Sequence, residues 1–153
     1  MALRTQNLRA QHNGVSPGVM RLRALYSGIS RGTERLVLNG AVPESEHTRM
    51  CCPFQEGDFP FPVKYGYCFV GEVVEGPVER VGQTCFALFP HQDLADIPED
   101  WAIPLPPDLP PRRTVLAANM ETALTAVWDS QAGPGDRVLV VGAGVLGLLM
   151  AAL

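Results

Sequence analysis

The sequence contains no apolar run that approaches the length of a membrane-spanning helix, which needs about 18 residues or more. Its first residues, MALRTQNLRAQHNG, lack the apolar core of a secretory signal. The four cysteines form no C-x-x-C pair and show no zinc-knuckle spacing. These absences argue against a membrane partner and a secreted, disulfide-bonded fold. We expect a cytoplasmic protein with reduced thiols.

Lysine is also scarce, and the basic residues form no stripe or run. A single lysine occurs among 12 basic residues, against 16 acidic residues and a net charge of −4. A nucleic-acid-binding surface needs clustered positive charge, so the sequence predicts no nucleic-acid partner. The 153 residues, 46% of them hydrophobic, suffice for one ordinary domain or for one domain and the opening of a second.

Glycine and proline, by contrast, are frequent and divide the chain into short segments typical of strands and turns. Residues 19–26 alternate, with apolar side chains on one face and two arginines on the other, and predict a half-buried strand. β-Branched and aromatic runs at 67–76 and 83–89 predict two more strands. Residues 30–40 have the polar start and terminal glycine of a short helix, and 43–62 are expected to form a polar loop.

The composition changes from residue 104 onward. Residues 104–111 read PLPPDLPP, a stiff extended linker, because proline fixes its own φ and restricts its predecessor. Residues 112–130 have the apolar rhythm of an amphipathic helix. After a glycine-rich turn, the strand-like run 137–141 leads directly into GAGVLG at 142–147, which fits G-x-G-x-x-G. A strand, a glycine turn and a helix in this order are typical of the start of a dinucleotide-binding fold.

Five stretches stand in a characteristic order along the chain: YSGISRGTE, PVKYGYCFVGEVVEG, ADIPEDWAIPLPPDL, ETALTAV and PGDRVLVVGAGVLG. This order resembles the N-terminal part of a zinc-type alcohol dehydrogenase of the medium-chain dehydrogenase/reductase superfamily. The resemblance implies a mainly β GroES-like barrel, the catalytic domain, over residues 1–128. It implies the first strand, turn and helix of an incomplete α/β Rossmann domain over 129–153. Members of the superfamily transfer hydride between NAD or NADP and an alcohol or carbonyl in the cleft between these domains.

The resemblance also implies which residues contact the cofactor. The glycines would form the tight turn, let the pyrophosphate approach and pack the helix on the strand, with the phosphates at the helix N-terminus. Thr122 resembles a threonine close to the nicotinamide, and Arg31 stands near the place of a basic side chain that contacts the pyrophosphate. A helix-terminal hydroxyl and a solvated arginine are the alternative interpretations. The predicted cofactor-binding residues are Arg31, Thr122, Gly142, Gly144, Val145, Leu146 and Gly147.

The positions at which zinc-dependent relatives hold the catalytic metal carry other residues. Alignment with the family places Ser30, Tyr67 and Ala118 there, and the family's four-cysteine structural zinc lobe is missing as well. A catalytic zinc needs three converging nitrogen, sulfur or oxygen ligands. We therefore predict an enzyme without zinc and so without this Lewis acid. Hydride transfer stays possible, because zinc-free members of the superfamily, such as quinone reductases, hold the carbonyl by shape and hydrogen bonds.

Three side chains are candidates for substrate chemistry. A hydroxyl of Ser30 or Tyr67 could hydrogen-bond a substrate oxygen, and Glu121 could pass a proton. For each of them taken alone, a purely structural role is the alternative. A different metal site made of Cys68, His91 and Glu121 stays open as well, because these residue types suit zinc, but it would require the three side chains to converge.

Two functions remain open at this point: an NAD(P)-dependent oxidoreductase, and a non-catalytic GroES-like β-barrel that binds a small molecule or another protein. A dinucleotide-binding unit needs about 30 residues of βαβ structure. The stretch VLGLLMAAL is apolar all round and needs covering layers. We therefore expect these residues to be the front part of a longer enzyme, inactive by themselves, that acts on a small alcohol or carbonyl compound. A homo-oligomer is an open option.

Overall fold

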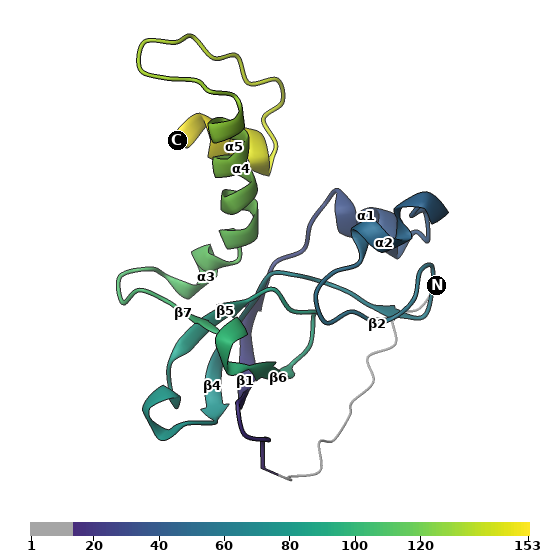
Figure 1. Cartoon of the computed structure of the whole chain (residues 1–153), viewed down its shortest axis with the longest axis vertical. Helices are drawn as coiled ribbons and strands as arrows, with labels where there is room; N and C mark the ends of the chain where they lie inside the picture. The colour runs from purple at the N-terminus through teal and green to yellow at the C-terminus, as the bar shows by residue number, and fades with distance from the viewer. Residues whose placement is uncertain (1–13) are drawn as a thin grey trace.

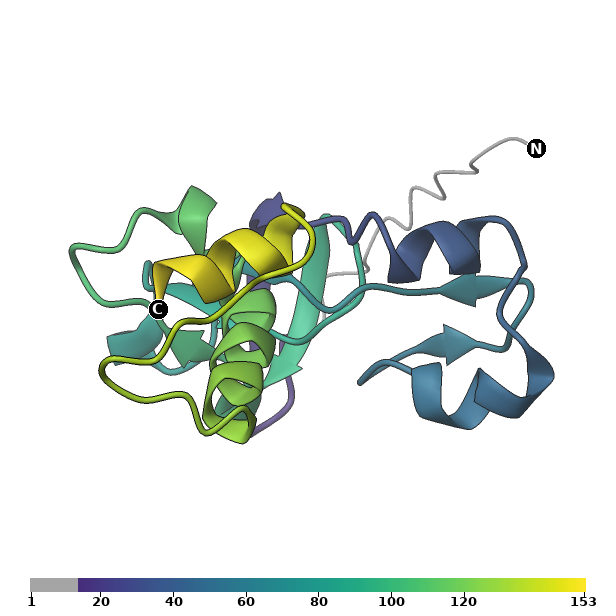
Figure 2. The same ribbon diagram turned by 90° about the horizontal axis from the view of Figure 1, so that it is seen from above.

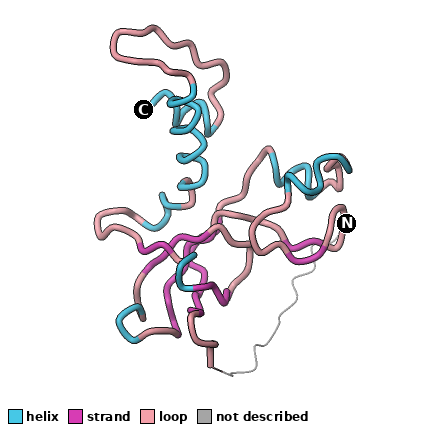
Figure 3. The backbone as a smooth tube through the Cα atoms, viewed as in Figure 1, coloured by secondary structure: helices cyan, strands magenta, loops and turns pink. Residues whose placement is uncertain are grey.

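The computed structural model describes residues 14–153, and its central feature is a five-stranded antiparallel sheet (Figures 1 and 3). The strand order is β6-β1-β4-β5-β7. The strands are β1 (Val19–Ser27), β4 (Phe69–Glu75), β5 (Thr84–Ala87), β6 (Leu94–Pro98) and β7 (Ile103–Pro104). The first three confirm the strands predicted at 19–26, 67–76 and 83–89. The other two were not predicted.

The expected barrel takes the form of an open sheet in residues 14–153, with β6 at one edge and β7 at the other. β7 is two residues long and ends on Pro104, which has no backbone N–H to donate. Pairing therefore stops at this edge instead of continuing around a barrel. The prediction of a mainly β fold is confirmed, whereas its closure into a barrel is not seen.

One face of the sheet forms the main core. Alternate residues of β1 and β4 point to this face, and the same holds for β5 and β6, so a single layer of apolar side chains is enclosed. Its most buried members include Met20, Leu22, Phe69, Val73 and Ile97, each at most 1% exposed. This burial follows from the alternating pattern that predicts the first strand.

The opposite face of β1 is covered by charge pairing. Arg21 donates from Nε and Nη2 to the two oxygens of Asp96 on β6, at 2.7 and 2.9 Å. Its Nη1 donates to Oε2 of Glu75 on β4, at 2.8 Å. This arginine is buried, although its alternation with apolar residues predicts a solvent-facing position. The side chain holds β1 to both of its neighbours.

A small lobe projects from one end of the sheet, away from α4 and α5 (Figure 2). It contains α1 (Thr33–Leu38), η1 (Glu44–Glu46), α2 (His47–Met50), β2 (Glu56–Gly57) and β3 (Val63–Lys64). Its own core consists of Val37, Val42 and Phe59, with Met50, Val63 and Tyr65 packed against them. The helix predicted within 30–40 is confirmed as α1. The expected loop at 43–62 instead contains two short helices and a strand, because its scattered apolar residues supply this second core.

The C-terminal part begins with α3 next to the sheet, and α4 and α5 project away from the sheet (Figure 1). The helix predicted over 112–130 is divided into α3 (Pro111–Thr114) and α4 (Ala117–Asp129), and α4 packs against α5 (Val145–Ala152). Two short 3-10 turns, η2 (Val78–Arg80) and η3 (Glu99–Trp101), complete the element order. Among the residues that the structure describes, no helix is long and apolar enough to cross a membrane.

The strand predicted at 137–141 does not form, and these residues follow an irregular path before α5. Their apolar side chains face outward: Val138 is 65%, Leu139 86% and Val141 91% exposed. A strand is stabilised by hydrogen bonds to a neighbouring strand, and no strand of residues 14–153 pairs with this segment. The prediction of a Rossmann strand, turn and helix is therefore met only by the helix that follows the glycines.

Candidate functional site

Three polar side chains from separate elements form a continuous hydrogen-bonded chain. Ser27 lies at the end of β1, Glu34 in the first turn of α1, and His91 in the loop between β5 and β6. Ser27 Oγ is hydrogen-bonded to Nδ1 of His91. The other ring nitrogen, Nε2, lies 2.6 Å from Oε2 of Glu34. We call this arrangement the Ser27–His91–Glu34 chain.

The backbone around His91 fixes the position of its ring. The main-chain N–H of His91 donates to the carbonyl oxygen of Tyr65, at 3.2 Å. Gly66 has φ +135°, which favours glycine, and a Cβ at this residue would lie 2.8 Å from Cδ2 and 2.9 Å from Nε2 of His91. Only glycine lets the ring lie this close to the chain.

Glu34 is held by the loop that precedes its helix. Its Oε1 accepts a hydrogen bond from the backbone N–H of Ser30, at 2.9 Å, while Oε2 faces His91. A carboxylate in the first helical turn is also favoured by the helix dipole. Both oxygens are therefore engaged, and the carboxylate lies between a candidate substrate residue and the imidazole.

Three titratable side chains close to Glu34 are kept in their neutral form. Burial is the largest cause that raises the pKa of the Tyr65 hydroxyl and of the Cys52 thiol, and the negative charge of Glu34 adds to both shifts. Burial, together with Glu34, raises the pKa of Cys68 to about 11. These three neighbours of Glu34 therefore carry no charge near neutral pH.

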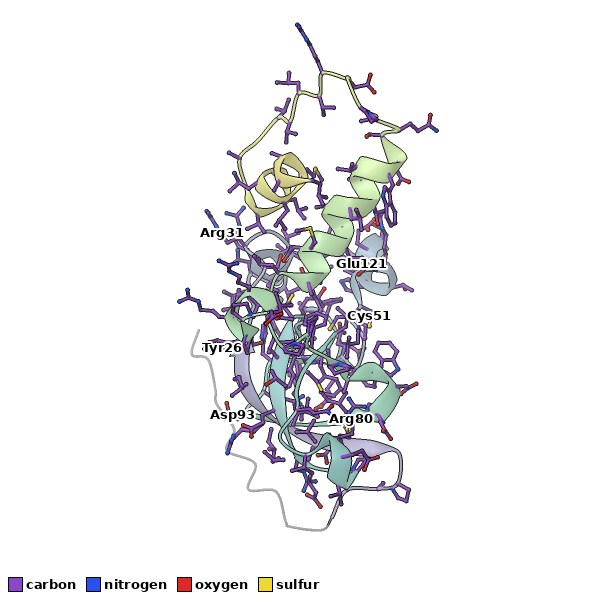
Figure 4. All side chains as sticks on the ribbon, turned by 90° about the vertical axis from the view of Figure 1, so that its left-hand side faces the viewer. Tyr26, Arg31, Cys51, Arg80, Asp93 and Glu121 are labelled. Atoms are coloured by element: carbon purple, nitrogen blue, oxygen red, sulfur yellow. The ribbon has the colours of Figure 1, made fainter. Side chains whose placement is uncertain are left out.

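The predicted substrate residues are divided between two places. The Ser30 backbone N–H bonds to the Glu34 carboxylate, and the Tyr67 ring meets the Tyr65 ring edge to face at 6.2 Å between centroids. Glu121 instead lies on α4, where its side chain is exposed (Figure 4). The structure describes no contact that joins Glu121 to Ser30 or Tyr67.

Glu121 lines an apolar groove between the sheet edge and the helices. The groove has a volume of about 480 Å³ and is lined mainly by Phe86, Leu88, Ile103, Leu105, Leu109 and Ala118. Thr122, the next residue on α4, is exposed and donates its hydroxyl to the carbonyl oxygen of Ala118, at 3.1 Å. Thr122 is the sixth residue of α4, so this bond lies inside the helix and is not made at its N-terminus.

The predicted cofactor residues lie at the start of α5 and before α1. Gly142 has φ +106°, so its turn favours glycine, and a Cβ at Gly147 would collide with the Gly142 carbonyl oxygen. Gly144 is the N-cap of α5 and has open space around its Cα, with Val145 and Leu146 in the first turn. Arg31 lies in the loop before α1, is exposed, and is separated from α4 in Figure 4.

The donor chemistry does not fit a catalytic zinc. Ser30, Tyr67 and Ala118 offer two weakly binding hydroxyls and one methyl group, where three strong ligands are needed. In residues 14–153 no three histidine, cysteine or acidic side chains converge as a metal site would require. The alternative site of Cys68, His91 and Glu121 is therefore not assembled, because His91 is turned toward Ser27 and Glu34.

Sequence reasoning missed Ser27 and Glu34, and it considered His91 only as a metal ligand. Ser27 and Glu34 both belong to YSGISRGTE, the first of the five characteristic stretches. The sequence signal that could have indicated them is a hydroxyl, Ser27, and a carboxylate, Glu34, on the two sides of a short loop. Their partner lies 57 residues from Glu34, and only the folded sheet brings it to them.

Comparison with known proteins supports the fold. No protein-family profile and no curated protein sequence matches the chain. Among solved structures, the chain is similar to the quinone oxidoreductase from Thermus thermophilus, which has also been solved in complex with NADPH. The TM-score is 0.65 and the sequence identity 24%, over 94% of this chain and 43% of the other. The chain thus shares the fold of that oxidoreductase and spans less than half of its length.

Proposed function

We propose that the chain is the front part of a cytoplasmic NAD(P)-dependent oxidoreductase of the medium-chain dehydrogenase/reductase superfamily. It would transfer hydride between the nicotinamide and an alcohol or carbonyl compound, without catalytic zinc. The observation that carries the proposal is the fold likeness to an NADPH-binding quinone oxidoreductase over 94% of the chain. The G-x-G-x-x-G turn at 142–147 supports it independently.

The start of α5 fits the pyrophosphate of a dinucleotide. Gly144 caps the helix without a side-chain hydrogen bond, and the space where a Cβ would stand is empty. The backbone N–H groups of Val145, Leu146 and Gly147 belong to the first helical turn, where donors lack partners within the helix and favour anions. These residues would hold the phosphates. The bound nicotinamide would supply or accept the hydride.

The substrate residues are proposed on chemistry and position. Ser30, whose backbone bonds to Glu34, and Tyr67, whose ring packs against Tyr65, could hydrogen-bond a substrate oxygen, whereas Glu121 lines the apolar groove. Arg31, in the loop before α1, and Thr122, on α4, are proposed as cofactor contacts. The domain boundary is proposed near residue 128, at the C-terminal end of α4.

Cofactor binding can be tested with one glycine variant and its matched control. Calorimetry should show NADPH or NADH binding to the gene product that carries these residues, and Gly144→Ala should weaken it at least about tenfold, because a methyl group would stand in the path of the pyrophosphate. Gly133→Ala, at another open glycine of the same connection, should bind as the wild type does. Absence of binding by the wild type would favour the non-catalytic binding module.

The proposal of a zinc-free enzyme has a separate test. Elemental analysis of protein purified without a histidine tag should find far less than one zinc per chain, because the ligand positions carry Ser30, Tyr67 and Ala118. One zinc per chain that is lost in Cys68→Ala would show that the metal is held by residues other than Ser30, Tyr67 and Ala118.

A further inference from the structure

The Ser27–His91–Glu34 chain leads from a partly buried carboxylate to an exposed hydroxyl. The Glu34 side chain is 11% exposed, the His91 side chain is 31% exposed, and Ser27 is exposed. Each group lies within hydrogen-bond distance of the next. A carboxylate, an imidazole and a hydroxyl in this order form a path along which a proton can pass in two short steps.

The two ring nitrogens of His91 have different partners, and this defines the direction of the path. The Glu34 carboxylate only accepts, so the Nε2 atom must carry a hydrogen toward it. The Nδ1 atom is then left to exchange a proton with the Ser27 hydroxyl. In serine hydrolases the assignment is the reverse, with serine at Nε2 and the carboxylate at Nδ1. The observed order argues for proton transfer through Ser27 and not for a hydrolytic nucleophile.

The side chains around the path do not compete for its proton. The titratable groups that face Glu34 are Cys52, Tyr65 and Cys68, and burial raises the pKa of each. They stay protonated near neutral pH. The negative charge of Glu34 is therefore directed to His91 and to the backbone N–H of Ser30.

We propose that this chain is the proton-transfer path of the site, with Ser27 as the residue that contacts the substrate oxygen and His91 and Glu34 as positioning residues. The inference rests on the proposed oxidoreductase function and adds its proton donor. Ser27 is next to Gly28, whose N–H donates to the carbonyl oxygen of Cys68, so the hydroxyl lies at the same strand end as Tyr67.

The proposed step balances protons and electrons. During reduction, the carbonyl carbon accepts a hydride from the reduced nicotinamide, and the carbonyl oxygen accepts the hydroxyl proton of Ser27. Ser27 regains a proton from Nδ1 of the imidazolium form of His91. His91 is left as neutral imidazole, which keeps its Nε2 hydrogen and donates it in a hydrogen bond to Glu34, and Nδ1 takes a new proton from water at the exposed edge of the ring. Oxidation of an alcohol follows the reverse order.

The test compares variants of equal shape in the gene product that carries these residues. With NAD(P)H and a panel of quinones, ketones and aldehydes, Ser27→Val should lower kcat about a hundredfold, whereas Ser27→Thr, which keeps the hydroxyl, should stay within a few-fold of the wild type. His91→Ala should lose a similar factor and recover part of it with added imidazole. His47→Gln, at a histidine bonded to the Val42 carbonyl oxygen, is the control and should keep full activity.

A second measurement determines which ring nitrogen of His91 carries the hydrogen and does not depend on enzyme turnover. Nitrogen-15 NMR of labelled histidine should show the neutral ring of His91 protonated at Nε2, and Glu34→Gln should reduce this preference. Equal kcat in Ser27→Val and Ser27→Thr would overturn the inference while leaving the oxidoreductase proposal intact. A ring protonated at Nδ1 in the wild type would also overturn it. A wild-type protein that reduces no carbonyl compound with either cofactor would refute both proposals together.

Discussion

The main sheet and the segment 137–153 use similar residues with opposite results. β4 reads FVGEVVE and is buried along most of its length, whereas RVLVV at 137–141 is just as rich in β-branched residues and lies exposed. β4 pairs with β1 on one side and β5 on the other. The segment 137–141 has no such neighbour among the strands of residues 14–153.

The difference teaches that strand propensity is realised only where a partner strand completes the ladder. The intrinsic preference of β-branched residues reflects their fit to a pleated, half-buried surface. An isolated extended segment leaves its backbone groups to water and its apolar side chains uncovered. A strand therefore needs both a suitable sequence pattern and a neighbouring strand to pair with. β4 and the segment 137–141 both have the pattern, but only β4 has the neighbouring strands.

The largest effect is expected where the sheet is most tightly packed. Phe69→Ala should destabilise the protein by about 3–5 kcal/mol, because it removes a fully buried ring from the main core and leaves a cavity. Leu139→Ala, at an 86% exposed residue, should change stability by less than about 0.5 kcal/mol. Urea unfolding followed by circular dichroism measures both. Similar losses in the two variants would contradict the comparison.

Much of the fold follows from local patterns in the sequence. Alternation at 19–26 and the apolar runs at 67–76 and 83–89 predict the three central strands, because each has a clear period or clear flanking glycines. β6, at 94–98, lacks this signal: its run LADIP is short, places the apolar Leu94 on the exposed side and ends in a proline. The edge strands β6 and β7 form because they pair with β1 and β5, and a local sequence pattern does not reveal such pairing between distant residues.

The site is less predictable than the fold for the same reason. Ser30 and Tyr67 are predicted from the positions at which zinc-dependent members of the resembled family hold a metal, and their role stays a prediction. In the structure the Ser30 backbone bonds to Glu34, and the Tyr67 ring packs against Tyr65. The hydrogen-bonded chain could not be found from spacing, since it joins a strand end, a helix start and a loop between two later strands. The Ser27 hydroxyl and the Glu34 carboxylate belong to one short stretch, but they are connected only through the His91 ring, which folding places between them.

A second, intermediate effect is expected from alkaline pH in the buried region. Burial and Glu34 raise the pKa of Cys68 from 9.0 to about 11, so the folded state keeps a proton that the unfolded state loses. The stabilisation is complete below pH 9 and decreases as the pH rises to about 11, by roughly 2–3 kcal/mol. Urea midpoints between about pH 7 and pH 11 should fall accordingly.

The matching variants distinguish this thiol from other causes. Cys68→Ala should have a shallower decrease over the same alkaline range, although not a flat one, because the pKa values of Cys52 and Tyr65 are raised in the same direction. Cys51→Ala, at an exposed cysteine, should keep the wild-type slope. An unchanged slope in Cys68→Ala would mean that this thiol does not drive the alkaline loss.

A smaller effect is expected at the lobe, whose core is less extensive than that of the sheet. The Tyr65 hydroxyl donates to the carbonyl oxygen of Met50, at 2.7 Å, and ties the end of β3 to α2. Tyr65→Phe should cost about 1 kcal/mol, because the ring stays packed and only one hydrogen bond is lost. Urea unfolding at neutral pH measures the change. A loss as large as that of Phe69→Ala would show that the lobe and the sheet do not differ in this way.

The smallest effect on stability, and the clearest effect on association, is expected at the exposed segment. Leu139→Ser combined with Val141→Ser should leave the free energy of unfolding within about 0.5 kcal/mol of the wild type, because neither side chain is covered. The same double variant should reduce self-association of the 153-residue chain, since contiguous exposed apolar residues promote contacts between molecules. Light scattering over a range of concentrations measures the self-association.

The control for this prediction is Val78→Ser, at an 89% exposed apolar residue outside the segment, which should scatter as the wild type does. Equal scattering by all three proteins would remove the claim that this segment is the adhesive surface, while a large loss of stability in the double variant would show that 137–141 packs against the fold in solution.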